Sequence, residues 1–388
     1  MKSTKSVLEY HNVQNIISAC LTVIILSLTI VGCGEQPVSV TQPPTAIAGS
    51  PPSPTLELDE SASKIDELLT SLTAKDEFTG AVLVARNGEI LLSHGYGLAD
   101  RDNNLPNTPQ TKFRLASITK EFTAAAILML QEQHKLNVED PICRYIPDCP
   151  AAWQEITIHH LLSHTSGIPN ITDFPDFSAF KATPSPPDQT IERFRNKPLD
   201  FEPGEKGSYS NSGYVLLGTI IEQASGQSYE SFLQKYIFEP VQMNNSGYDH
   251  NDGALATGYT GSRARWETPG DLDMSLPFAA GGLYSTIEDL YLWDQALYTE
   301  RLLSQESLDR MFTSQAMLSN LGMDYGYGWF IQDVNNRRVL SHSGGIEGFA
   351  TEMRRYPDDK VTIIILSNRD TTNVIAVGDQ IARIVFTK

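Results

Sequence analysis

Strand-like segments occur at both ends of this chain, and the stretch between them is mostly helical in pattern. Near the start, residues 81–84 and 90–92 are apolar runs joined by Asn87-Gly88, a dipeptide typical of a two-residue β-hairpin. Near the end come four more strand-like runs and a closing helix, at residues 327–331, 338–341, 349–354, 362–366 and 374–386. This order predicts one α+β domain whose antiparallel sheet joins both termini.

The middle of the chain completes the predicted architecture. Residues 117–136 and 214–236 have the apolar content of helices, and long loops rich in proline and glycine separate such segments. Residues 65–72 carry apolar side chains at helical spacing and predict a helix that opens the domain. We therefore expect helices that flank the sheet and an inserted, mostly helical lobe. The loops at 170–187 and 250–277 are expected to shape any cleft.

The first 33 residues have the layout of a secretion signal. Lys2 and Lys5 precede an apolar run of about 16 residues, shorter than the roughly 20 that a membrane-spanning helix needs. The run ends in residues 30–33, IVGC, which resemble the lipobox of bacterial lipoproteins. That resemblance implies cleavage before Cys33 and lipid on its sulfur. The alternatives are an ordinary signal cut elsewhere and an uncleaved anchor helix.

The predicted location follows from this amino terminus. Gly34, rather than Asp, follows the lipobox cysteine, which implies transfer to the outer membrane in a bacterium with two membranes. We expect an exported protein, anchored by lipid to the periplasmic face of that membrane or to the cell surface. Residues 34–58 are rich in Pro, Ser and Thr and predict a disordered linker, so the folded domain is expected to span residues 59–388.

The remaining cysteines lie close together in the sequence. Cys20 leaves with the signal and Cys33 carries the lipid, which leaves Cys143 and Cys149 in an oxidising compartment. The five residues between them allow ring closure, so a disulfide is the favoured interpretation and two free buried thiols are the alternative.

Charge and histidine content argue against two classes of partner. The chain has 47 acidic and 29 basic side chains, and no run of Lys or Arg offers a stripe for phosphates, so nucleic acid is not an expected partner. His159, His160 and His164 are close in sequence, but no carboxylate motif accompanies them. We assign these histidines structural roles and expect no metal.

Three Ser-x-x-Lys patterns occur, and their surroundings distinguish them. Residues three apart lie one above the other on a helix, so the lysine amine can take the serine proton. The patterns begin at Ser61, Ser117 and Ser178. Only the one at Ser117 opens a strongly apolar helix, which would bury Lys120 and favour its uncharged, basic form. Ser117 is therefore the candidate nucleophile.

Two further short segments are candidates for the same site. Tyr209-Ser210-Asn211 follows a Pro-Gly turn and precedes an apolar helix, and residues 342–345, HSGG, join a predicted strand end to a glycine-rich segment. Glycines at an edge can present backbone amides to an anion. Each segment alone is weak evidence for a site, and the order in which the segments occur along the chain is more informative.

In this order the motifs resemble those of the serine β-lactamase and penicillin-binding-protein family, in the branch of class C β-lactamases, low-molecular-weight DD-peptidases and esterases. The resemblance covers about residues 62–388. It implies a β-lactamase/transpeptidase-like fold and a covalent acyl-enzyme without a cofactor. The segments that carry it are 113–120 (FRLASITK), 161–168 (LLSHTSGI), 203–218 (PGEKGSYSNSGYVLLG), 281–286 (GGLYST) and 325–329 (YGYGW).

The resemblance also implies roles for single residues. Ser117 would attack a carbonyl, Lys120 would receive its proton, and Tyr209 would act as a tyrosinate or as a proton relay near the leaving group. The remaining roles are binding of the substrate amide by Asn211, substrate binding by His342 and Ser343, and an oxyanion hole made by the backbone amides of Ser117 and Gly345.

His342 is the main departure from the family pattern. Many relatives carry lysine there, in Lys-Thr-Gly, and a lysine supplies a permanent charge for a substrate carboxylate, whereas histidine is only partly charged near neutral pH. The expected substrates are cell-wall D-Ala-D-Ala peptides, β-lactams or related amides, and small esters are the alternative. A catalytically silent lipoprotein that binds the cell wall is the third hypothesis.

Overall fold

The computed structural model describes residues 60–251, 255–261 and 265–387. The predicted signal, the lipidation site Cys33 and the predicted linker lie outside these residues. Within the described chain, no helix combines the length and apolar character needed to cross a membrane.

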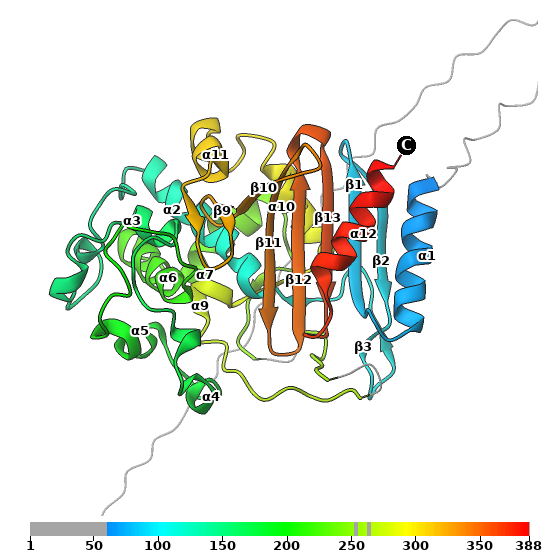
Figure 1. Cartoon of the computed structure of the whole chain (residues 1–388), viewed down its shortest axis with the longest axis horizontal. Coiled ribbons are helices and arrows are strands. Elements are labelled where there is room, and N and C mark those ends of the chain that lie inside the picture. Colours follow the sequence, from blue (N-terminus) through cyan, green and yellow to red (C-terminus); the bar gives the residue numbers. More distant parts are fainter. Residues whose placement is uncertain (1–59, 252–254, 262–264, 388) are drawn as a thin grey trace, which may run out of the picture. The chain divides into compact units, whose positions relative to one another are not determined.

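An eight-stranded antiparallel sheet forms the centre of the domain (Figure 1). Its order, β2-β1-β13-β12-β11-β10-β9-β8, places the first and last strands of the chain side by side, so the sheet joins both ends as predicted. Two small sheets, β3-β4 and β5-β7-β6, lie outside it. The strands are β1 (Gly80–Arg86), β2 (Glu89–Tyr96), β3 (Leu98–Asp100), β4 (Leu105–Pro106), β5 (Phe113–Arg114), β6 (Gly247–Tyr248), β7 (Leu283–Ser285), β8 (Ala316–Leu318), β9 (Met323–Tyr325), β10 (Phe330–Val334), β11 (Arg337–Ile346), β12 (Phe349–Tyr356) and β13 (Val361–Ser367).

Helices cover both faces of this sheet and build the inserted lobe (Figure 1). The first and last helices, α1 and α12, contact each other and lie on the same face. The helices are α1 (Glu60–Ala74), α2 (Thr119–Glu132), α3 (Ile158–Leu162), α4 (Phe177–Phe180), α5 (Pro187–Arg195), α6 (Asn211–Ser225), α7 (Tyr229–Leu233), α8 (Glu239–Val241), α9 (Phe278–Gly281), α10 (Ile287–Ala296), α11 (Gln305–Phe312) and α12 (Val374–Phe386). Shorter turns are η1 (Ala116–Ile118), η2 (Ile142–Arg144), η3 (Ala151–Trp153), η4 (Ile171–Asp173), the π-helical η5 (Gln234–Phe238) and η6 (Pro357–Asp359).

The central strands β1, β12 and β13 are buried along almost their whole length because their side chains alternate between two covered faces. Val82 of β1 packs with Ile65 of α1 and Ile381 of α12 on one face. Its neighbour Leu83 belongs to the larger core on the other face, together with Leu290 of α10. Each fully buried side chain of this size contributes about 1.5–3 kcal/mol, so the two-sided burial fixes the register of the strand.

The first predicted hairpin is confirmed, and its turn explains the sequence. β1 pairs with β2 across Asn87 and Gly88, whose φ angles are 54° and 81°. Two successive left-handed residues form the turn that matches the twist of a two-stranded ribbon, and Asn and Gly adopt that conformation at little cost.

Several predicted elements are wrong in extent. The strand expected at 327–331 is β10, which begins only at Phe330, and the helix expected at 117–136 is α2, which ends at Glu132. The helix expected at 214–236 ends at Ser225, because Gly226 adopts a left-handed φ of 71° and Ser228 then caps the separate helix α7. The strand expected at 338–341 is β11, which continues to Ile346. The HSGG segment therefore lies within a strand and does not follow its end.

A disulfide joins Cys143 and Cys149 in the structure, with the Cα atoms 5.2 Å apart. It closes the loop that contains η2, next to the lobe. Both cysteines are partly buried and pack against the larger core.

A buried ion pair connects the helical layer to the sheet. The Arg355 Nε on β12 donates to the Asp294 Oδ1 on α10 at 2.5 Å, and both side chains are almost fully buried. Thr362 on the neighbouring strand β13 donates to the other carboxylate oxygen at 2.6 Å. The carboxylate therefore has partners at both oxygens, which offsets the cost of burying its charge.

We expect Asp294→Ala to lower the free energy of unfolding by about 3–5 kcal/mol, because it leaves the Arg355 guanidinium buried without its counterion. Urea denaturation of the purified protein measures this. The matched control is Asp359→Ala, which removes the partly exposed ion pair with Arg337 and should cost below about 1 kcal/mol. Equal losses in the two variants would contradict the structural role assigned to Asp294.

Candidate active site

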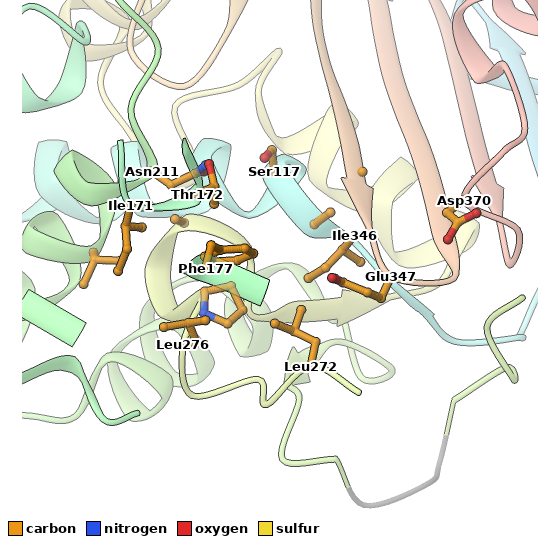
Figure 2. A pocket seen from close by; sticks show the side chains of 16 residues that line it. Ser117, Ile171, Thr172, Phe177, Asn211, Leu272, Leu276, Ile346, Glu347 and Asp370 are labelled. Carbon is orange, nitrogen blue, oxygen red and sulfur yellow. The ribbon is translucent and has the colours of Figure 1, made fainter. Parts of the chain in front are cut away.

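Ser117 lies in the turn η1, directly before α2, and borders a cavity of about 490 Å³ (Figure 2). The preceding residue, Ala116, has a φ of 49°, a strained conformation for a residue with a side chain. Hydrogen bonds hold this segment in place: the Leu115 amide donates to the Leu283 carbonyl at 2.8 Å, and the Thr351 hydroxyl donates to the Leu115 carbonyl at 2.8 Å. The strain is therefore maintained by strands β7 and β12.

Lys120 is fully buried one turn after Ser117. Its Nζ lies 3.1 Å from the Ser117 Oγ, 2.8 Å from the Asn211 Oδ1 and 2.7 Å from the Ala280 carbonyl oxygen. Burial lowers the pKa of the Lys120 amine well below its usual value. The two carbonyl-type oxygens can only accept, so they take both N–H groups of the neutral amine. Its lone pair is then left for the hydroxyl of Ser117.

Tyr209 completes the group from a segment far away in sequence. The Lys120 Nζ lies 4.9 Å from the centre of its ring, and the ring packs against those of His164 and Phe330. Burial raises the pKa of the Tyr209 phenol, and a hydrogen bond with Ser117 acts in the opposite direction. The sequence left a tyrosinate and a proton relay as alternative roles for Tyr209. Burial favours the neutral phenol, which suits a proton relay.

Asn211 begins α6 and lines the same cavity (Figure 2). Its Oδ1 accepts from Lys120, and its Nδ2 lies 3.3 Å from both the Asn170 Oδ1 and the Thr172 Oγ1. The backbone N–H of Asn211 also donates to the Asn170 Oδ1 at 2.9 Å. Asn170 and Thr172 thus set the orientation of the Asn211 side-chain amide. No motif marked them, although they closely follow the segment 161–168.

Strand β11 brings Gly345 to the same cavity as Ser117. A Cβ on the adjacent Gly344 would lie 2.3 Å from the Leu115 carbonyl oxygen, so only glycine allows the strand to approach the nucleophile segment this closely. A Cβ on Gly345 would meet no atom within 4 Å. The two residues predicted to form the oxyanion hole therefore border one open space.

His342 has a different environment from the one its predicted role requires. Its ring is buried, its Nδ1 donates to the Ser343 carbonyl at 2.7 Å, and its Nε2 accepts from the Tyr325 hydroxyl at 3.1 Å. Burial, with the nearby Lys120 amine as a second cause, lowers the pKa of His342 to about 3. The imidazole is thus uncharged at neutral pH. Neither His342 nor Ser343 is among the residues that line the described cavity.

His164 is a neighbour of this site whose position sequence reasoning did not predict. Its backbone is left-handed, with a φ of 59°, and its ring lies 4.4 Å from that of Tyr209. Its Nδ1 accepts from the Ser210 amide at 3.2 Å. Burial lowers the pKa of His164 well below its usual value, so the site contains two uncharged imidazoles.

The loops expected to shape the cleft do contribute to its wall. Ile171, Thr172 and Phe177 come from the first loop, and Leu272 and Leu276 come from the second. Beyond these, two acidic residues that no motif indicated, Glu347 and Asp370, also line the cavity (Figure 2).

The other Ser-x-x-Lys patterns have ordinary explanations. Lys64 forms an exposed ion pair with Glu60, and Lys181 forms a partly buried ion pair with Glu347. His159 and His160 bond to the Tyr327 hydroxyl and to the Thr157 amide, respectively. Among the described residues, no group of three His, Cys, Asp or Glu side chains is placed to hold a metal ion.

Comparisons with known proteins agree with this geometry. The Beta-lactamase family model matches residues 65–386. A penicillin-binding protein of Bacillus subtilis strain 168 is 35% identical over 328 residues, which cover 79% of this chain and 71% of the relative.

Solved structures show the same fold. A penicillin-binding protein from Bacillus halodurans has a TM-score of 0.72 and 27% identity, and the match covers 81% of this chain and 98% of that one. A D-amino acid amidase from Ochrobactrum anthropi SV3 has a TM-score of 0.74 at 24% identity, over 85% of this chain and 100% of that one, and so shares the fold. The chain therefore belongs to the Beta-lactamase family of serine β-lactamases and penicillin-binding-protein-like hydrolases.

Proposed function

We propose that the protein is a serine hydrolase that forms an acyl-enzyme at Ser117, acting on D-Ala-D-Ala peptides of the cell wall or on related amides. The observation that carries this proposal is that the Ser117 hydroxyl, which borders the cavity, contacts both the buried Lys120 amine and the Tyr209 phenol. A hydroxyl becomes an effective nucleophile when an adjacent base accepts its proton.

In the proposed acylation step, the Ser117 Oγ bonds to the substrate carbonyl carbon while its proton passes to the neutral Lys120 amine. The carbonyl oxygen becomes negative, and the amides of Ser117 and Gly345 stabilise it. When the bond to the leaving group breaks, Tyr209 gives its proton to the departing nitrogen and regains one from the Lys120 ammonium. Both residues then return to their starting states. A water molecule releases the acyl group by the reverse sequence.

Two observations support the proposal that the bond cleaved in the substrate is an amide. The related structures include penicillin-binding proteins and a D-amino acid amidase, and Asn211 offers an amide at the cavity wall. The uncharged His342 favours a second candidate, an esterase, because it provides no charge for the carboxylate of a peptide or β-lactam. The intact contacts of Ser117 argue against a silent binding protein.

We expect Ser117→Ala to abolish covalent labelling by fluorescent penicillin and by a fluorophosphonate, because each reagent needs the hydroxyl as nucleophile. In-gel fluorescence measures both. The matched control is Ser178→Ala, which changes the serine of a Ser-x-x-Lys pattern that lacks a buried lysine. Labelling by fluorophosphonate but not by penicillin supports the esterase, and labelling by neither in the wild type contradicts the proposed hydrolase.

The pH dependence of acylation tests the role of Lys120. Because burial lowers the pKa of its amine well below the usual value, labelling should decline only as the pH falls through that lowered pKa. Lys120→Arg keeps a charge at every pH and should reduce labelling about 10²-fold or more. Labelling rates measured across the pH range check this. A rise confined to the region near pH 10.4, where an exposed lysine loses its proton, would contradict the role.

We also propose that lipid on Cys33 anchors the enzyme to the membrane that faces its substrate. Cys33→Ser removes the thiol that accepts the lipid and should move the protein from the membrane fraction to the soluble fraction, because a cleaved, unlipidated chain has no anchor. Fractionation with immunoblotting measures this. A protein that remains fully membrane-bound after the substitution would favour the uncleaved anchor helix.

A further inference from the structure

The charged side chains that line the described part of the catalytic cavity are both acidic. They are Glu347 and Asp370, and no lysine or arginine side chain borders this part of the cavity. Burial lowers the pKa of both imidazoles next to Tyr209, those of His164 and His342, and so favours their uncharged form. A substrate cation would meet two carboxylates at this end of the cavity, of which Glu347 is paired with the Lys181 ammonium when no substrate is bound.

Glu347 already binds an ammonium group. It follows β11, two residues after Gly345, and its Oε1 accepts from the Lys181 Nζ at 2.6 Å. Lys181 directly follows α4 of the inserted lobe, and the two side chains are 23% and 22% exposed. This position is therefore shaped for an N–H donor with positive charge. The donor is a long, flexible side chain that a substrate amine can displace.

Asp370 provides a second, incompletely satisfied acceptor. Its Oδ2 accepts from the Gly348 amide at 3.1 Å, which ties it to the turn that carries Glu347. Its Oδ1 is buried and has no hydrogen-bond partner in the structure. Because this buried oxygen does not face the open cavity, Asp370 favours a cation in the cavity through its negative charge and not through a hydrogen bond to Oδ1.

Between the nucleophile and these carboxylates the cavity is apolar. Ile346 lies between Ser117 and Glu347 in Figure 2, and the side chains of Leu272 and Phe177 border the same space. A ligand that extends from Ser117 to Glu347 thus passes an apolar stretch and ends at a negative one. Methylene groups suit the first part and an ammonium group suits the second.

We propose that this end of the cavity is a subsite for an ammonium group on the acyl part of the substrate. The preferred substrates are acyl donors in which an apolar segment separates a terminal amine from the scissile carbonyl. The Glu347 carboxylate binds that amine, the Asp370 carboxylate adds negative charge at the same end of the cavity, and the Lys181 ammonium pairs with Glu347 when no substrate is bound. This inference rests on the proposed function, because it assigns the acyl group that Ser117 receives.

Two p-nitrophenyl esters that differ at one group test the subsite. The 6-aminohexanoate ester ends in an ammonium group, and the heptanoate ester has a methyl group in its place. We expect the wild type to have a kcat/KM about tenfold higher for the amino ester. Glu347→Gln should bring the ratio of the two values close to one, and Asp370→Asn should lower it. Lys181→Met removes the competing amine and should raise the ratio.

The ratio separates binding of the amine from general damage to the fold, because a structural defect lowers both rates together. The matched control is Glu139→Gln, which neutralises the glutamate of an exposed ion pair with Arg310 and should leave the ratio unchanged. Equal kcat/KM values for the two esters in the wild type, or a parallel loss for both in Glu347→Gln, would overturn the subsite.

The test also distinguishes this inference from the proposed function. If neither ester is cleaved and a fluorophosphonate does not label Ser117, the hydrolase itself is refuted. If Ser117 is labelled but the amino ester has no advantage, or is not cleaved, only the subsite is refuted. A preference for an anionic analogue, such as the adipate half-ester, that disappears in Lys181→Met would show instead that Lys181 binds substrate carboxylates.

Discussion

The burial of one amine determines most of what this protein can do. Lys120 lies inside the domain, where its hydrogen-bond partners among the described residues are the Ser117 hydroxyl and two carbonyl-type oxygens. Those oxygens come from α6 and α9, so Lys120 can act as the proposed base only if both helices pack against α2. The inserted lobe therefore contributes to the proposed catalytic group as well as to the wall of the cavity.

This arrangement has a cost in stability whose sign follows from the pKa of Lys120. The folded pKa is lowered, so between that value and the unfolded value of about 10.4 the folded protein holds fewer protons than the unfolded chain. The penalty is therefore greatest at low pH and disappears as the pH rises toward the unfolded pKa. The large two-sided core and the buried pair of Arg355 and Asp294 offset this penalty.

The sequence predicts what depends on local pattern and on long motifs. The hairpin at Asn87-Gly88, the closing helix and the sheet that joins both ends are confirmed, because apolar alternation and turn residues specify them locally. The break at Gly226 was missed because a single glycine within a helical pattern is ambiguous until its φ is known. The state of His342 was also not predictable, since its pKa depends on burial by segments distant in sequence.

The two ends of the cavity also differ in how far the sequence predicts their function. Near Ser117, long motifs bring together residues whose chemistry can be expected from their types. At the other end, Glu347 and Asp370 belong to no motif, and they become neighbours because the turn after β11 meets the segment after β13 through the Gly348 amide. Reaction type is thus recorded in the motifs, whereas the choice of acyl group depends on contacts between loops. Relatives that share the motifs can differ in these loop contacts, so the preferred acyl group depends on the cavity of each protein.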